Sequence, residues 1–80
     1  MVRTKIFNQD EFQDGLIEQT IKEVCVILEE KGYNPINQIV GYLMSGDPGY
    51  ISSYKEARNK IAQFERSKIL EILVRDYIGN

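Results

Sequence analysis

The chain has 80 residues, enough for one domain, and its 42% hydrophobic and 28% charged residues are typical of an ordinary soluble protein. Ten basic and twelve acidic residues give a net charge of -2, which provides no general attraction to nucleic acid or to an anionic membrane. No apolar run approaches the length of a membrane span, and the two basic residues near the start are not followed by the apolar core of a signal peptide. We therefore expect a cytoplasmic protein without membrane insertion.

Cross-links are not expected to stabilise a domain of this size. Cys25 is the single cysteine, so a disulfide within the chain is excluded. There is no histidine, and one thiol cannot fill the tetrahedral shell of a structural zinc ion. We expect no metal and no cofactor. Because a small domain buries only a modest part of its surface, we expect self-association to add stability.

The N-terminal segment, residues 1–15, is predicted to be a flexible arm, and residues 16–80 are predicted to form a single helical domain. The second half of the arm is polar and acidic and lacks a helical apolar pattern. The first helix is predicted over residues 16–31, because Ile17, Ile21, Val24 and Leu28 follow one another at helical spacing. Gly32 is predicted to stop this helix.

The second helix is predicted to begin at Asn34 and Pro35, since asparagine caps a helix well and proline suits the first helical position. It is predicted to end at Gly46. Its apolar residues are Ile36, Ile39, Val40, Leu43 and Met44. Gly41 lies inside this helix at a cost of about 1 kcal/mol relative to alanine, which indicates a close packing contact there.

Two more helices are predicted after the turn formed by Asp47, Pro48 and Gly49. The residues from Ser53 to Glu56 match a capping box and predict the start of the third helix. The fourth helix is predicted to end before Gly79 and is apolar over more than half of its circumference. Part of this surface is therefore our candidate dimer interface. The candidate interface residues are Ile69, Leu70, Leu73, Val74 and Tyr77.

The sequence indicates that the protein is not an enzyme, and we identify no catalytic residue. No histidine is available for acid–base chemistry near neutral pH. Cys25 lies between two valines in an apolar helix, without a basic neighbour or helix N-terminus to lower its pKa, which favours a buried structural thiol. Glu29 and Glu30 are adjacent in a helix and point about 100° apart, so they do not converge on one point.

A helix–turn–helix that binds nucleic acid is the main alternative. The second and third helices flank a short turn with glycine, which is the outline of that motif. The bases that would meet phosphates are Lys55, Arg58, Lys60, Arg66 and Lys68. Acidic residues interleave with them, and a DNA-binding domain usually has a stronger excess of positive charge, so nucleic acid is not the partner we expect.

A long block of the sequence resembles a known family. The block comprises residues 28–43 (LEEKGYNPINQIVGYL), followed by Ser45 to Pro48, residues 57–59 and residues 65–66. It resembles the IreB family of regulatory phosphoproteins from Gram-positive bacteria, and the likeness extends over about residues 20–78. The resemblance implies a compact helical fold with a helix–turn–helix-like outline that forms a homodimer.

The resemblance also implies a function. It implies a substrate of a membrane-anchored Ser/Thr kinase of the cell-wall-sensing type, opposed by a phosphatase and linked to envelope stress and antibiotic tolerance. The family's phosphorylated threonines lie in the N-terminal arm just ahead of a phenylalanine. Thr4, three residues before Phe7, fits that position. Thr20 is the chain's other threonine and lies in the first predicted helix. Family members often carry two threonines in the arm, whereas this arm carries one.

We therefore expect an all-α, four-helix homodimer that acts in signalling without catalysis. A kinase would modify Thr4, and the added charge of roughly -1.5 to -2 would change how the arm docks or which downstream protein the dimer binds. The phosphate would pair with a nearby Arg or Lys, or it would disrupt an apolar docking of Ile6 and Phe7. The alternatives are the nucleic-acid-binding regulator and a structural subunit of a larger assembly.

Overall fold

The computed structural model describes residues 9–79, and these residues are helical without a β-strand. The helices are α1 (Gln9–Glu30), α2 (Pro35–Ser45), α3 (Ala57–Ala62) and α4 (Arg66–Ile78), with two short 3-10 turns, η1 (Pro48–Tyr50) and η2 (Tyr54–Glu56), between α2 and α3. The prediction of an all-α fold with four helices is therefore confirmed.

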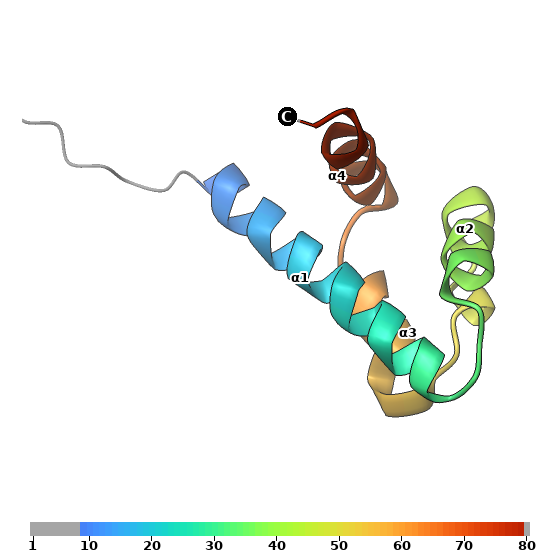
Figure 1. Ribbon diagram of the computed structural model, residues 1–80. Helices are drawn as coiled ribbons and strands as arrows, with labels where there is room; N and C mark the ends of the chain where they lie inside the picture. The colour runs from blue at the N-terminus through green and yellow to red at the C-terminus, as the bar shows by residue number, and fades with distance from the viewer. Residues whose placement is uncertain (1–8, 80) are drawn as a thin grey trace, which may run out of the picture.

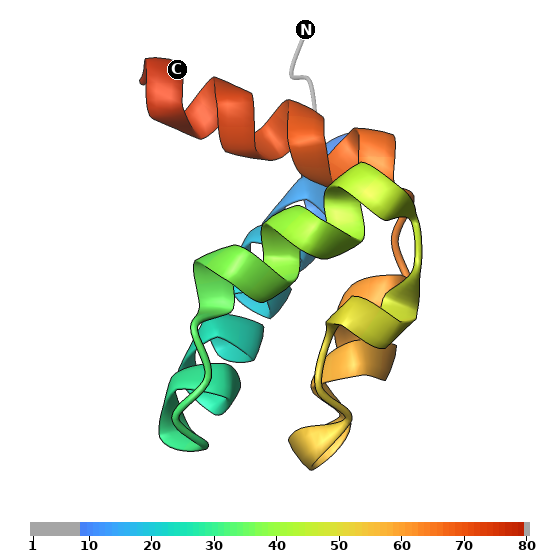
Figure 2. The same ribbon diagram turned by 90° about the vertical axis from the view of Figure 1, so that its right-hand side faces the viewer.

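The other three α-helices pack against α1, which is the long diagonal helix in Figure 1. Helix α3 packs on α1, and α2 also contacts α1. In the second view, α4 crosses near the C-terminal end of α2 (Figure 2). A hydrogen bond from Arg66 Nη1 to the Leu43 carbonyl oxygen, 2.9 Å long, joins the start of α4 to the last turn of α2. Helix α1 is thus the element that each of the other three α-helices contacts.

The core is formed where these helices meet on the predicted stripe of α1. Ile17, Val24 and Leu28 are fully buried, and Ile21 is partly buried against them. The buried apolar residues are Ile17, Val24, Ile27, Leu28, Ile39, Tyr42, Leu43, Ile51, Ala57, Ile61, Ile69 and Ile72. The helical spacing of the first predicted stripe therefore identified the face of α1 that packs against the rest of the chain.

The start of α1 differs from the prediction. The helix begins at Gln9, seven residues before the predicted start at residue 16, so residues 9–15 are helical. The physical reason is an ionic contact with α4: Asp14 pairs with both Lys68 and Arg75. This contact holds the first turns of α1 without an apolar stripe. Residues 1–8 of the predicted arm lie outside the described residues.

The predicted caps of α2 are confirmed. The Asn34 side chain accepts a 3.1 Å hydrogen bond from the Asn37 backbone N–H, and Pro35 occupies the first helical position. Gly46 ends the helix with a left-handed φ of 79°. Gly41 packs directly on the ring of Tyr50, because a Cβ at this position would lie 2.5 Å from Tyr50 Cδ1. The expected close contact at Gly41 is therefore present.

The predicted capping box at Ser53 is wrong. Ser53 precedes the 3-10 turn η2, its side chain makes no capping hydrogen bond, and Lys55 and Glu56 adopt left-handed φ values of 48° and 66°. The preceding serine takes this role instead. Ser52 Oγ accepts from the Tyr54 N–H at 3.1 Å, and its carbonyl accepts from the Arg58 N–H. Helix α3 consequently begins at Ala57 and has only six residues.

We predict that Gly41→Ala destabilises the protein although alanine is the better helix former. The gain in helix propensity is about 1 kcal/mol, whereas overpacking costs about 1–3 kcal/mol, so we expect a net loss of about 1 kcal/mol in urea unfolding. Gly15→Ala in α1 is the matched control, because a Cβ there meets no atom within 4 Å. It should stabilise the protein. Equal stabilisation by both changes would contradict the Gly41–Tyr50 contact.

Candidate functional site

Thr4, the predicted phosphorylation site, lies outside the described residues. The surfaces that could respond to a modified arm are therefore those of residues 9–79. Three such features are described below. They are an ionic cluster between α1 and α4 that the sequence did not predict, the predicted bases around α3, and an apolar face over α2 and α4.

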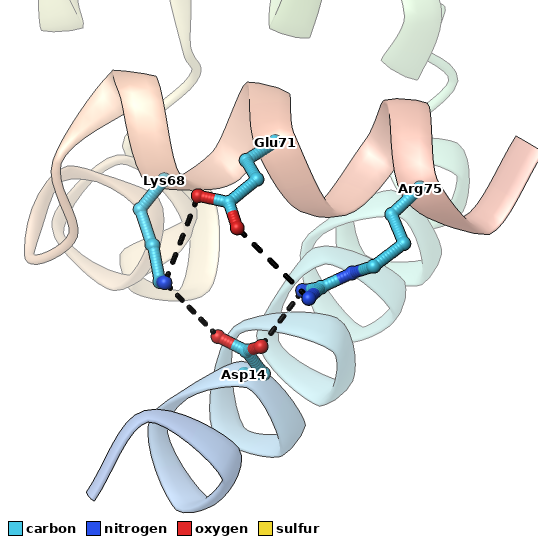
Figure 3. Close-up of polar contacts among 4 residues, drawn as sticks. All are labelled: Asp14, Lys68, Glu71 and Arg75. Atoms are coloured by element: carbon cyan, nitrogen blue, oxygen red, sulfur yellow. Dashed lines mark hydrogen bonds and ion pairs between the residues drawn. The ribbon is translucent and has the colours of Figure 1, made fainter. Parts of the chain in front are cut away.

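The ionic cluster consists of Asp14 on α1 with Lys68, Glu71 and Arg75 on α4 (Figure 3). Arg75 Nη2 donates a 2.7 Å hydrogen bond to Asp14 Oδ2, and Lys68 Nζ lies 3.5 Å from Asp14 Oδ1. Glu71 is more distant, with its carboxylate oxygens 3.7 Å from Lys68 Nζ and 3.9 Å from Arg75 Nη1. The cluster therefore ties α1 to α4 through the short Arg75–Asp14 bond and the longer Lys68–Asp14 ion pair, while Glu71 contacts both cations from within α4.

Asp14 is the best enclosed group in this cluster, with its side chain 19% exposed. The hydrogen bond from Arg75 lowers the pKa of Asp14, although partial burial opposes that effect; the charge of Lys68 also lowers it. In return, the bond to Asp14 raises the pKa of Arg75. Asp14 Oδ1 is buried and has no hydrogen-bond partner, so Lys68 stabilises it by charge at 3.5 Å. We did not predict this cluster from the sequence, because Asp14 lies more than 50 positions before Lys68 and Arg75.

The bases proposed for a nucleic-acid surface make contacts within the chain. Lys55 Nζ lies 2.9 Å from Glu30 Oε1, and this hydrogen bond lowers the pKa of Glu30. Lys60 Nζ lies 3.5 Å from Glu23 Oε2.

The remaining three candidate bases are also engaged. Arg58 Nε donates to the Ile51 carbonyl oxygen at 2.9 Å. Arg66 bonds the Leu43 carbonyl oxygen, and its guanidinium packs against Gly46, where a Cβ would approach within 2.9 Å. Lys68 belongs to the ionic cluster described above. These bases hold helices together, and α3 is too short to present the extended row of bases expected of a recognition helix.

The apolar face differs in part from the predicted interface. Ile69 is fully buried in the core of the single chain, so it is not available to a partner, and Leu73 is partly buried. Leu70 and Val74 are half exposed, and Tyr77 is 93% exposed. Their spacing of three and four residues places them on one side of α4.

Helix α2 adds residues that belong to the single apolar stripe of the second predicted helix. Ile36, Val40 and Met44 are exposed, whereas Ile39 and Leu43 are buried. The signal for this split was their spacing of four residues, which places them on one edge of the stripe. Between α1, α2 and α4 lies a hollow of about 230 Å³ with a wholly apolar lining. Its lining residues are Ile21, Cys25, Ile36, Ile39, Val40, Leu43 and Leu73.

Cys25 is one of the residues that line this hollow and is partly buried. Burial raises the pKa of its thiol, and the nearby charge of Glu29 raises it further. The thiol is therefore less prone to ionise than an exposed cysteine, as the predicted structural role requires. Among residues 9–79, no group of three or more acidic or cysteine side chains is placed to hold a metal ion. No helix in that same stretch is long and apolar enough to cross a membrane.

The residues that resembled a known family have clear structural roles at the end of α2. Ser45 Oγ donates to the Gly41 carbonyl oxygen at 2.7 Å and accepts from the Asp47 N–H at 3.0 Å. Asp47 Oδ1 in turn accepts from the Gly49 N–H at 2.8 Å. This chain of bonds shapes the turn between α2 and η1. Ser45 and Asp47 of the block thus have a structural role in this turn.

A small helical domain whose conspicuous surfaces are an ionic cluster and an apolar face is typical of a protein that binds other proteins. The comparison with known families identifies which such protein it is. The family described as IreB regulatory phosphoprotein matches residues 2–79 of the 80-residue chain. The chain therefore belongs to this family and is a regulatory phosphoprotein of bacterial type, as the resemblance in the sequence implied.

We predict that Asp14→Asn destabilises the protein at neutral pH and changes its acid sensitivity. The pKa of Asp14 is lowered from 3.8 by Arg75, so its contribution to stability is complete above that ordinary value and is lost as the pH falls through the lowered pKa. The urea midpoint of the variant should therefore be lower at pH 7, and its difference from the wild type should shrink in acid.

Glu29→Gln is the control for Asp14→Asn, because it removes an exposed acid from the same helix. Its midpoint should stay close to that of the wild type at pH 7. A difference between Asp14→Asn and the wild type that persists unchanged through acid would show that the charge of Asp14 does not stabilise the fold.

Proposed function

We propose that this protein is a cytoplasmic substrate of a membrane-anchored Ser/Thr kinase in envelope-stress and antibiotic-tolerance signalling, and that Thr4 receives the phosphate. The observation that carries the proposal is the match to a regulatory phosphoprotein family over residues 2–79, a range that includes Thr4. Thr20 is a poor alternative acceptor, because it is buried within α1. A phosphatase would reverse the modification.

We propose further that the protein acts as a homodimer through the apolar face of α2 and α4. The support is an apolar hollow lined by residues of α1, α2 and α4, together with exposed apolar side chains on two of these helices. These side chains are Ile36, Val40 and Met44 on α2 and Leu70, Val74 and Tyr77 on α4. Exposed apolar patches on small proteins commonly mark interaction sites. A second copy supplies the same apolar residues, as a twofold contact requires.

The regulation we propose is non-catalytic. Phosphorylation adds negative charge to the arm ahead of α1, and the altered protein binds a downstream protein differently. We therefore propose that the helical domain binds the downstream protein and that the phosphorylated residue of the arm regulates this binding.

We predict that Thr4→Ala abolishes phosphorylation by the wall-sensing Ser/Thr kinase of the source organism. Ser67→Ala is the control, since it removes an exposed hydroxyl from α4 instead. The measurement is phosphopeptide mapping by mass spectrometry after incubation of each purified protein with the kinase. Full phosphorylation of Thr4→Ala would disprove the assignment, whereas loss of phosphate from Ser67→Ala alone would move the site to α4.

We predict that Val74→Glu converts the protein to a monomer, because it places a charge in the apolar face of α4. Val26→Glu is closely matched: Val26 is 63% exposed and Val74 is 55% exposed, and both are valines on helix surfaces. Sedimentation equilibrium should give half the wild-type mass for Val74→Glu and the dimer mass for Val26→Glu. The reverse pattern would place the interface on the outer side of α1.

A further inference from the structure

The cations of the ionic cluster have unused capacity to bind an anion. Lys68 Nζ lies 3.5 Å from Asp14 and 3.7 Å from Glu71, and both distances exceed the 2.7–3.2 Å of a good hydrogen bond. Arg75 makes one short bond through Nη2, while its Nη1 is 3.9 Å from Glu71. The Lys68 ammonium and the Arg75 guanidinium thus both point toward the carboxylate of Asp14, and only part of their N–H groups make short hydrogen bonds there (Figure 3).

Glu71 is the weaker of the two carboxylates that share these cations. Its side chain is 54% exposed and its contacts are the longest in the cluster, whereas Asp14 is well enclosed and holds the 2.7 Å bond. An incoming anion can therefore displace Glu71 into solvent while the tie between Asp14 and Arg75 stays in place. A phosphate monoester suits this exchange, since it carries up to two charges and three acceptor oxygens.

The cluster is within reach of a group on the N-terminal arm. Thr4 precedes Gln9 by five residues, which span at most about 18 Å when extended. Asp14 follows Gln9 by five residues, a rise of about 8 Å along α1. A chain that turns back along α1 can therefore bring a phosphate on Thr4 to Lys68 and Arg75.

The other ion pairs on α1 are farther away. Lys60 is held at Glu23 and Lys55 at Glu30, and these acids lie about 21 Å and about 32 Å along α1 from Gln9. Lys22 is a single cation about 20 Å along the same helix. Among the described cations that pair with acids of α1, Lys68 and Arg75 are thus held closest to its beginning.

We propose that Lys68 and Arg75 form the binding site for the phosphorylated threonine of this chain's own N-terminal arm, with Glu71 as the group that the phosphate displaces. The inference rests on the proposed function, because it takes Thr4 as the phosphate acceptor. In this proposal the phosphate is bound by two cations of α4, so phosphorylation holds the arm against the junction of α1 and α4.

The test uses full-length protein carrying phosphothreonine at position 4 from synthesis. Cys25 allows a synthetic peptide of residues 1–24 to be ligated to residues 25–80, which leaves the natural sequence. Phosphorus NMR then follows the ionisation of the phosphate with pH. We expect Lys68 and Arg75 to hold the second pKa of the phosphate roughly one pH unit below its ordinary value of about 6.

Three variants decide the outcome. Lys68→Gln should raise the phosphate pKa toward the value in the urea-unfolded chain, with Arg75 keeping part of the shift, whereas Lys60→Gln, which breaks an ion pair of the same 3.5 Å length at Glu23, should leave the pKa unchanged. Glu71→Gln should lower it further, because a competing carboxylate is gone. That last effect is not expected of a purely structural role, and it does not require removal of a cluster cation.

The proposal is overturned if the phosphate pKa is the same in the wild type, Lys68→Gln and Glu71→Gln, a result that would assign the phosphate to bases of the arm itself. It is also overturned if the lowered pKa returns to its ordinary value on dilution, because the phosphate would then be bound by a second copy. Since the phosphate is installed chemically, a kinase that does not modify Thr4 would defeat the proposed function and leave this result unaffected.

Discussion

The burial of one apolar stripe on α1 is the constraint on which the rest of the structure depends. Ile17, Val24 and Leu28 are fully buried, and α2, α3 and α4 each contact α1. None of those three helices exceeds 13 residues, and isolated helices of that length are marginal in water. Their helical state therefore relies on packing against α1, where each buried aliphatic side chain contributes about 1.5–3 kcal/mol.

The same constraint explains why apolar side chains remain on the surface. With only 80 residues, the domain uses the inner sides of α2 and α4 for its core and leaves apolar residues such as Val40 and Tyr77 exposed. At the junction of α1 and α4, the helices are held by charges at Asp14, Lys68 and Arg75. A domain built in this way has an exposed apolar face and a charged junction close to the start of α1.

Local sequence signals predicted the parts of the fold that local interactions determine. Asn34, Pro35 and Gly46 bound α2 as expected, because a cap is made by side chains and φ values within a few residues. The buried stripe of α1 was likewise predicted from the helical spacing of its apolar residues. The start of α1 and the start of α3 were not, because the first depends on ion pairs from Asp14 to α4 and the second on hydrogen bonds of Ser52.

The candidate site was predicted only in part for a similar reason. The apolar excess of α4 was visible in the sequence, but periodicity could not show that Ile69 faces the core while Tyr77 faces solvent. Nor could it show that Val40 of α2 joins the same surface, since that depends on how α2 lies against α1 and α4. Asp14 pairs with Lys68 and Arg75, which lie more than 50 residues away in the sequence, and no local pattern predicts such a contact.

The central claim is that one threonine ahead of α1 carries the regulatory phosphate of this IreB-family protein. The most direct measurement is mass spectrometry of the protein isolated from its own bacterium before and after exposure to a wall-targeting antibiotic. We predict a single phosphate on the peptide that contains Thr4, and the fraction of the protein that carries it should change on exposure to the antibiotic. A protein without phosphate under both conditions, or with phosphate elsewhere and an unmodified Thr4, would contradict it.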